Sequence, residues 1–206
     1  IVFGDWSSDV CSSDLQNSEK PWIAVVEFSV PKEIQDKGIN GWTIAKGIEH
    51  ALFQRNCFRL ANRSDISKVI KELKFQSSES EDREKARQMG SMTGADLLVT
   101  GDISLSESGY TVTAKLIDAV KNAGEVKRSV KASTPELTGL DQLYSHIAFY
   151  FSMTPDELIN YGKEKLKEKN YDEALSAFKQ AKVESPAALL KDRKSTRLNS
   201  SHRIRS

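Results

Sequence analysis

Apolar runs and helical repeats alternate along the first third of the chain. Residues 21–31, PWIAVVEFSVP, form an apolar, β-branched run closed by a proline, which predicts a buried strand. Residues 32–41, KEIQDKGING, predict a polar loop with two glycines. In residues 42–56, apolar side chains recur on one helical face, and residues 57–63 follow as a second predicted strand.

A second helical pattern follows this strand. Ser64 and Asp65 are candidate N-cap residues for residues 66–75, in which isoleucine, valine and leucine repeat at helical spacing. The next stretch is polar and then helical, and it is predicted to end at Gly90 or Gly94. Two consecutive helices are therefore expected before the next strand.

Three strands joined by short turns are predicted after these helices. Residues 95–109 and 110–120 read as two strands with a tight Ser-Gly turn, and the second alternates apolar and polar side chains. Residues 126–133 read as a third strand, whose lysines and arginine suit a sheet edge. The order of elements predicts an α/β fold: a mixed sheet, parallel at its start and an antiparallel meander at its end, with helices packed on it.

The pattern from residue 134 onward is helical, and residues 155–186 predict a helical hairpin. Gly162 and Ala174 would let its two helices approach closely, whereas Tyr171 and Phe178 would fill the gap between them. The spacing resembles the tetratricopeptide repeat; the positions that define the repeat are Gly162, Tyr171, Ala174, Phe178, Ala181 and Pro186. Because about three such hairpins are needed for a stable stack, the resemblance implies a truncated array.

The two ends of the chain resemble a translated sequencing adapter. One oligonucleotide, read in opposite senses, can encode both DWSSDVCSSD near the start and DRKSTRLNSSH near the end. We therefore expect residues 1–15 and 189–206 to be disordered and foreign to the natural protein. The expected domains between them are a mixed-sheet domain over 16–152 and the helical hairpin over 153–188.

Charge and composition narrow the class of protein once these ends are set aside. Residues 16–191, which lie between the two adapter-encoded stretches, hold 25 basic and 25 acidic residues, so they give no electrostatic footprint for nucleic acid. No apolar run approaches the roughly 18–20 residues that span a bilayer as a helix. Cys57 is the one cysteine outside the ends, so no disulfide within the natural chain is expected, and we predict a small buried side chain.

The body of the chain resembles the CsgG-like family, the curli production assembly and transport components, with the amino-terminal domain of TolB and LpoB-type lipoproteins as relatives. Four stretches carry this resemblance: IAVVEFS, CFRLANRSDISKVIKE, ARQMGSMTGADLLVTGDIS and YTVTAKLIDAVKNAGEV. The resemblance implies a periplasmic mixed-sheet domain, often lipid-anchored at the outer membrane, without known catalysis. The pore-forming members carry long membrane-inserting hairpins, whereas the connection between Ile103 and Thr111 is short, which predicts an adaptor and not a pore.

No residue pattern predicts catalysis, a metal or a cofactor. His50 and His146 lie in helical patterns and are expected to be structural, and no His/Cys/Asp cluster has metal-ligand spacing. Asp102 and Glu107 could form a carboxylate pair, but a strand end explains them without chemistry. The acidic stretch 79–84 is expected to be the solvated start of a helix.

The first functional hypothesis is a non-enzymatic bacterial envelope protein, an accessory or adaptor in envelope assembly or secretion that binds other proteins. It lies in the periplasm or at the outer membrane, binds no nucleic acid and has no transmembrane segment in this sequence; a homo-oligomer is left open. The alternative is a nucleotide- or small-ligand-binding domain that uses loop 32–41 at the carboxyl end of the first strand. A subunit of a secretion pore is the third hypothesis.

Overall fold

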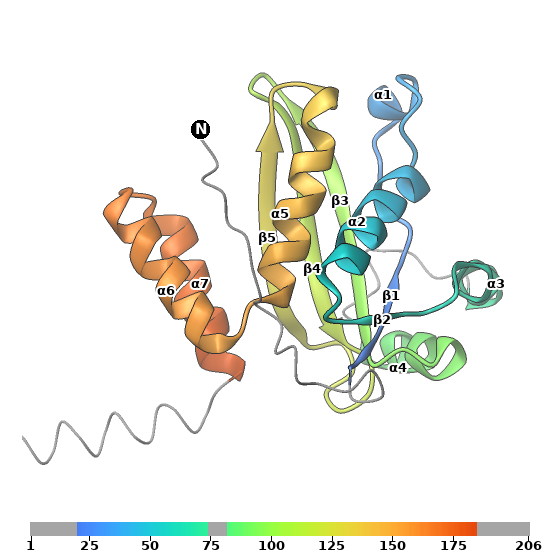
Figure 1. The fold of residues 1–206 in the computed structure, drawn as a ribbon. Coiled ribbons are helices and arrows are strands. Elements are labelled where there is room, and N and C mark those ends of the chain that lie inside the picture. Colours follow the sequence, from blue (N-terminus) through green and yellow to red (C-terminus); the bar gives the residue numbers. More distant parts are fainter. Residues whose placement is uncertain (1–19, 74–81, 185–206) are drawn as a thin grey trace, which may run out of the picture. The chain divides into compact units, whose positions relative to one another are not determined.

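The computed structural model describes residues 20–73 and 82–184. The chain divides into two compact units, Ile1–Ser152 and Met153–Ser206. Figure 1 shows the sheet and most of the helices in the first unit and a helical hairpin in the second. Both adapter-like ends, residues 1–15 and 189–206, lie outside the described residues.

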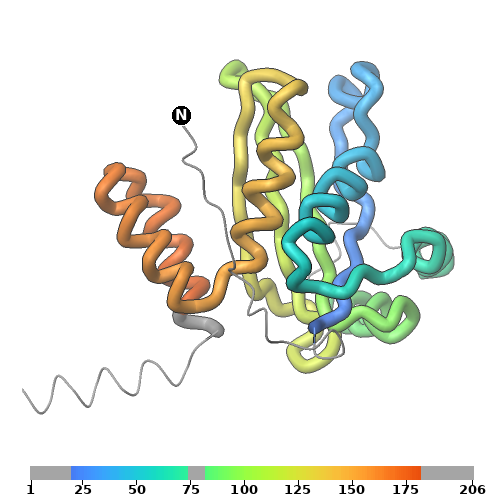
Figure 2. The backbone as a smooth tube through the Cα atoms, viewed as in Figure 1, coloured from blue at the N-terminus to red at the C-terminus, as the bar shows by residue number. Residues whose placement is uncertain are grey.

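A five-stranded mixed sheet forms the centre of the first unit. Its strands, in chain order, are β1 (Trp22–Val25), β2 (Arg59–Leu60), β3 (Leu97–Ser106), β4 (Gly109–Asp118) and β5 (Val126–Thr134). Their spatial order is β2-β1-β3-β4-β5. β1 pairs in parallel with β2 and β3, whereas β3, β4 and β5 pair antiparallel, as the consecutive passes of the chain in Figure 2 show. The predicted mixed sheet is therefore confirmed.

The first two strands are shorter than their apolar runs predict. After β1, the chain stays beside β3 through isolated backbone bonds, from the Val26 N–H to the Val99 carbonyl at 2.8 Å and from the Ser29 N–H to the Gly101 carbonyl at 2.9 Å. The expected loop 32–41 contains a short helix, α1 (Lys32–Gln35). Its Ile34 side chain is fully buried and packs into the core, which holds this turn in place. Apolar burial thus extends beyond the regular strand.

Two helices, α2 (Gly41–Arg55) and α5 (Leu140–Ser152), lie across one face of the sheet (Figure 1). A short 3-10 helix, η2 (Leu137–Gly139), leads into α5. The two helices pack closely at Gly47, where a Cβ atom would stand 2.2 Å from the Tyr144 ring. A glycine is therefore required at this crossing, because any larger residue would overlap the buried tyrosine.

A second apolar cluster lies under helices α3 (Arg63–Leu73) and α4 (Arg83–Thr93). Ala24 of β1 and Leu98 of β3 join it from the sheet, and Ile66, Val69 and Met89 join it from the helices. Both pairs of helices, α2 with α5 and α3 with α4, thus bury apolar side chains against the sheet. Burial of this kind is the usual source of stability for an α/β fold.

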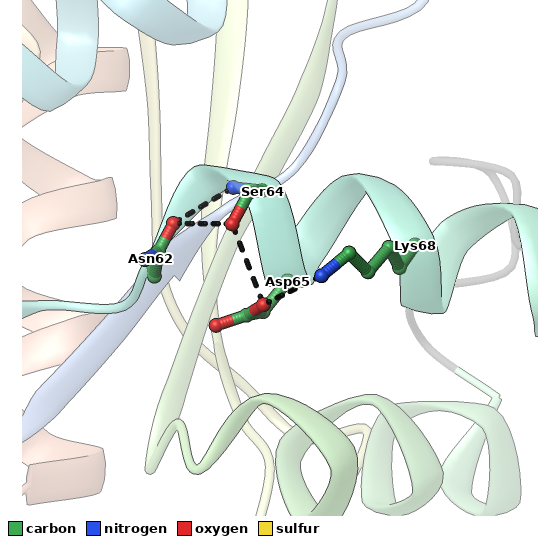
Figure 3. A network of polar contacts seen from close by, with 4 residues as sticks. All are labelled: Asn62, Ser64, Asp65 and Lys68. Carbon is green, nitrogen blue, oxygen red and sulfur yellow. Dashed lines mark hydrogen bonds and ion pairs between the residues drawn. The ribbon is translucent and has the colours of Figure 1, made fainter.

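The first turn of α3 is capped one residue before the helix begins (Figure 3). The Asn62 carboxamide oxygen accepts from the Ser64 N–H at 2.9 Å and from its hydroxyl at 2.8 Å. Asp65 lies 3.5 Å from the Lys68 ammonium, one helical turn further on. The predicted caps, Ser64 and Asp65, are therefore wrong: they belong to the first turn, and Asn62 holds the cap.

Arg128 joins the edge strand β5 to the end of α5. Its side chain is only 5% exposed, and its Nη1 donates to the carbonyl oxygens of Tyr150 at 2.8 Å and Phe151 at 2.9 Å. These carbonyls lie in the last turn of the helix, where no N–H group of the helix is left to bind them. β5 is an edge strand, as predicted, but this arginine is buried and structural instead of a solvated edge residue.

The second unit is a pair of helices, α6 (Pro155–Lys167) and α7 (Tyr171–Glu184). A capping box starts α6: Thr154 accepts from the Glu157 N–H, and the Glu157 carboxylate accepts from the Thr154 N–H at 2.6 Å. Pro155 occupies the first turn, where its missing N–H costs nothing. The predicted helical hairpin is present in the described residues.

Small residues set the spacing between the two helices of the hairpin. A Cβ atom at Gly162 would lie 2.6 Å from the Phe178 ring, and Ala174 and Ala177 are fully buried. Tyr171 is 64% exposed, so the expectation that it fills the gap is wrong. The Tyr161 hydroxyl instead donates to Glu173 of the other helix at 3.0 Å.

Lys165 joins the same polar contact between the helices. Its ammonium lies 2.8 Å from the Glu168 carboxylate and 3.7 Å from that of Glu173. Lys165 of α6 thus forms ion pairs with the residue that follows its own helix and with a residue of α7. Pro186, the last of the predicted repeat positions, lies outside the described residues.

The crossing of α2 and α5 gives a direct test of packing. We expect Gly47→Ala to destabilise the first unit by about 1–2 kcal/mol, because overpacking outweighs the gain in helix propensity. The double variant Gly47→Ala with Tyr144→Leu should recover part of this loss, since the smaller side chain makes room. Denaturant unfolding checks this; equal stability of Gly47→Ala and the unaltered chain would contradict the close approach.

The hairpin gives a second test, which is independent of the first. Gly162→Ala should lower hairpin stability by about 1 kcal/mol, because the added methyl group meets the Phe178 ring. Lys163→Ala, at the exposed neighbouring position, is the control and should be close to neutral. Amide hydrogen exchange in α7 reports the local unfolding free energy, and unchanged protection in Gly162→Ala would rule out the contact.

Candidate functional site

The residues considered for catalysis or metal binding in the sequence are dispersed over the structure. His50 is exposed on α2, 3.1 Å from Gln54, and His146 is half-buried on α5. Asp102 lies in the middle of β3 and Glu107 in the turn after it, which separates them by about 13 Å of strand. Within residues 20–73 and 82–184, no group of three or more His, Cys, Asp or Glu side chains could hold a metal ion.

Cys57 differs from its prediction in its surroundings. The residue lies between α2 and β2 and is half-buried, so the expectation of a buried side chain is wrong.

Loop 32–41 is the ligand-binding loop of the alternative hypothesis, and two of its residues have structural roles. The Asn40 side chain caps α2 by accepting from the Thr43 N–H at 2.8 Å. A Cβ atom at Gly41 would lie 2.0 Å from the Phe28 carbonyl oxygen, so this glycine serves a close approach between backbone segments. Asn40 and Gly41 are thus both used in packing α2 against the sheet, which argues against a ligand at this loop.

The acidic stretch 79–84 is described only from Asp82 onward. Asp82 caps α4 by accepting from the Lys85 N–H at 3.0 Å, and Glu84 lies in the first helical turn. Negative charge near a helix N-terminus is stabilising, so these residues are explained by the helix they begin. The remainder of this stretch, residues 79–81, lies outside the described residues.

A polar surface on the antiparallel part of the sheet is the strongest candidate site. Side chains of one face form three polar rows across β3, β4 and β5, and in two of these rows every member is exposed or half-buried, whereas Thr100 of the third row is buried. We call the two accessible rows the open face; its residues are Asp102, Ser104, Thr111, Thr113, Lys131 and Ser133. All six are exposed or half-buried, whereas Ile103, Val112 and Ala132, which alternate with them, are buried.

Each row of the open face has its own chemistry. One row joins Asp102, Thr113 and Lys131, so opposite charges flank a hydroxyl group. In the other row, the Thr111 and Ser133 hydroxyls lie 2.8 Å apart and share a hydrogen bond. Together the two rows present short hydroxyl side chains, one cation and one anion, which can form hydrogen bonds and ion pairs with a partner.

A β-bulge lies where the end of β4 pairs with the start of β5. The register changes between Leu116, opposite Arg128, and Ile117, opposite Val126, so Lys127 has no opposite residue. The bulge directs the Lys127 ammonium to within 3.2 Å of the Asp118 carboxylate, which is only 5% exposed. The same carboxylate accepts from the Val120 and Lys121 N–H groups, both at 2.9 Å.

Burial alone would raise the pKa of Asp118, but its hydrogen bonds and cation have the larger combined effect. The Val120 N–H and the Lys127 ammonium together hold the pKa of this carboxyl below its ordinary value of 3.8. Burial also raises the pKa of the Tyr144 hydroxyl to about 12, with a further contribution from Asp141. Both shifts belong to residues that order the fold, not to a reactive site.

One family model is similar to the central part of the first unit. A family model described as peptidoglycan-synthase activator LpoB matches residues 36–128. Residues 36–128 resemble LpoB. The match runs from the end of α1 to the start of β5, and it therefore includes β3, β4 and most of the open face. No curated protein matches the sequence.

Several solved structures are similar at low identity. The LpoB C-terminal domain from Salmonella enterica is 18% identical over 56% of this chain and 83% of its own, with a TM-score of 0.43. A lipoprotein from Neisseria meningitidis is 16% identical over 64% and 96%, with a TM-score of 0.45. TolB from Acinetobacter baumannii is 19% identical over 65% of this chain and 28% of its own, with a TM-score of 0.41. At these values the likenesses carry no argument about function.

These matches correct two assignments made from the sequence. The leading assignment, to the CsgG-like curli components, is wrong: the matching family model is LpoB, which the resemblance had included only as a relative. The tetratricopeptide assignment is also unsupported, because the match ends at residue 128 and the described hairpin departs from the expected packing at Tyr171. The helical hairpin itself remains part of the fold.

The family description agrees with the expectation of a protein that acts by binding other proteins. An activator of a synthase acts through a protein partner and is not itself the enzyme, which is consistent with a non-enzymatic binding protein. Within the described residues, no helix is both long and apolar enough to cross a membrane.

The charge pair at the bulge predicts a pH effect on stability. Because the pKa of Asp118 is lowered on folding, its contribution is complete above the unfolded value near 3.8 and is lost as pH falls through the lower folded value. We therefore expect the stability difference between the unaltered chain and Asp118→Asn to shrink steadily from pH 5 towards pH 3. Thermal unfolding at a series of pH values measures it; a difference that stays constant would contradict the ionised pair.

Proposed function

We propose that this protein is a non-enzymatic component of the bacterial cell envelope that binds a peptidoglycan synthase and activates it. The observation that carries the proposal is the LpoB family match over residues 36–128. Peptidoglycan is made outside the cytoplasmic membrane, so we place the protein in the periplasm, anchored at the outer membrane in the way that the envelope resemblance implies.

The arrangement of the first unit supports a binding role. Several ionisable side chains of this unit serve in caps and in the bulge, and within its described residues no group of three or more His, Cys, Asp or Glu could hold a metal ion. The open face, in contrast, presents hydroxyl and charged groups from three adjacent strands on one rigid surface. Polar surfaces of this kind are typical of the rims and faces of non-obligate protein interfaces.

We assign the docking surface for the synthase to the open face, with Thr113 at its centre. Thr113 lies between Asp102 and Lys131 in the cross-strand row, so a partner that covers this surface must contact its hydroxyl group or exclude water from it. Central positions of an interface carry most of its binding energy. The hairpin unit lies outside the matched residues, and we assign it no part in this contact.

The test is a polymerisation assay with a purified peptidoglycan synthase from the same organism. The unaltered protein should raise the rate of glycan-strand synthesis and bind the synthase in an interferometry assay. Thr113→Arg places a long cation at the centre of the open face and should weaken binding about tenfold, with a matching loss of stimulation at limiting concentration. Its melting temperature should stay close to that of the unaltered chain, since the side chain is at the surface.

Lys46→Glu is the matched control, because Lys46 is exposed on α2 and lies outside the open face. This variant should stimulate the synthase like the unaltered protein. Failure of the unaltered protein to bind or stimulate any synthase of that organism would overturn the proposed function. Full stimulation by Thr113→Arg would retain the function but remove the open face as the docking surface.

A further inference from the structure

The free edge of β5 carries a second surface with defined chemistry. β5 is the last strand of the sheet, and none of the described residues pairs with its outer edge. The direction of the backbone groups on this strand follows from the hairpin register. Ser106 and Gly109 close the β3–β4 hairpin, so odd-numbered residues of β4 bond to β3 and even-numbered residues bond to β5.

Two further backbone hydrogen bonds agree with this alternation of odd- and even-numbered residues. The Asp118 N–H donates to the Glu125 carbonyl, towards β5, and the Ile103 N–H donates to the Ser29 carbonyl, on the opposite side of β3 from β4. Because Val112 is opposite Ala132 and Ala114 is opposite Val130, even-numbered residues of β5 bond to β4. The backbone N–H and C=O groups of Lys131 and Ser133 consequently point away from the sheet.

We infer that β5 binds an extended, acidic segment of a partner protein, which adds to the sheet as a sixth strand. The backbone groups of Lys131 and Ser133 would bond to the added strand, as in other cases of strand addition. Alternate side chains of that strand would lie on the open face beside Lys131, and the others on the face covered by α5. A segment in which acidic residues alternate with small apolar residues would therefore present a carboxylate to Lys131 and apolar side chains to the other face.

Charge decides what kind of strand fits this edge. An added strand lies about 5 Å from β5 and about 14 Å from β3, so Lys131 is its near neighbour, whereas Asp102 lies beyond the screening length of about 8 Å at physiological salt. The open-face charge that the added strand meets is thus positive. A carboxylate next to Lys131 is stabilising, and a lysine at the same place is destabilising.

The same argument disfavours a second copy of this chain as the occupant. In a symmetric antiparallel pairing of two β5 strands, the open-face charge that each strand brings from residues 129–133 is Lys131, so the two lysines would face each other or lie diagonally. Arg128 cannot relieve this, because its guanidinium is buried under the end of α5. Natural edge strands use lysine in this way to avoid self-pairing.

The probe is a short fluorescein-labelled peptide in which glutamate alternates with valine, compared with its counterpart in which lysine replaces glutamate. Fluorescence anisotropy with the full chain should show binding of the glutamate peptide and weaker binding of the lysine peptide. Lys131→Glu should weaken the glutamate peptide about threefold to tenfold and strengthen the lysine peptide, which reverses the preference. Lys46→Glu, with the same change of charge on α2, should leave both affinities unchanged.

A backbone variant separates strand addition from simple charge attraction. Ser133→Pro removes an N–H group that points outward and leaves the bonds to β4 intact, so the fold should be retained as judged by circular dichroism. It should weaken the glutamate peptide at least about tenfold although the charge is unchanged. Amide hydrogen exchange of Lys131 and Ser133 should slow when the peptide binds the unaltered chain.

Three results would overturn the inference: no binding of the glutamate peptide, equal binding by Ser133→Pro, or a concentration-dependent dimer of the unaltered chain that Ser133→Pro abolishes. The peptide assay contains no synthase and does not depend on the proposed function. Stimulation of a synthase by a chain that binds neither peptide would therefore leave that function in place and remove only the strand-addition surface.

Discussion

The register of the three antiparallel strands decides the use of each face of the sheet. In β4, Val112 and Ala114 point to the side covered by α5, and Thr111 and Thr113 point to the open face. A shift of one residue would exchange the two sets, burying hydroxyl groups under the helix and exposing the core. The apolar core and the candidate docking surface are therefore two results of one pairing register.

The β-bulge adjusts this register where the sheet ends. Lys127, the extra residue of β5, reaches the buried Asp118, and the residue after it, Arg128, reaches the end of α5. Two neighbouring cations of one strand therefore serve different partners. Bulges are commonly used in this way to redirect side chains and end the pairing of strands.

Much of the fold follows from local patterns, because period-two and period-3.6 repeats are short-range signals. The alternation in residues 110–120 predicted both faces of β4 correctly. The burial of Arg128 could not be predicted, since it depends on helix carbonyls more than twenty residues away in the sequence. The exposure of Tyr171 and the cap at Asn62 were also missed, because a repeat pattern and a list of preferred cap residues do not fix which candidate the tertiary contacts select.

The bond between Arg128 and the last two carbonyls that it reaches in α5 also limits how the chain can change in evolution. A guanidinium has planar donors in a fixed arrangement, so it can serve a helix end only at one length of that helix. An insertion within α5 would rotate its final turn by about 100° per residue and remove Tyr150 and Phe151 from the arginine. Length variation among homologues should therefore be found in the segment around η2, and α5 should keep its number of residues.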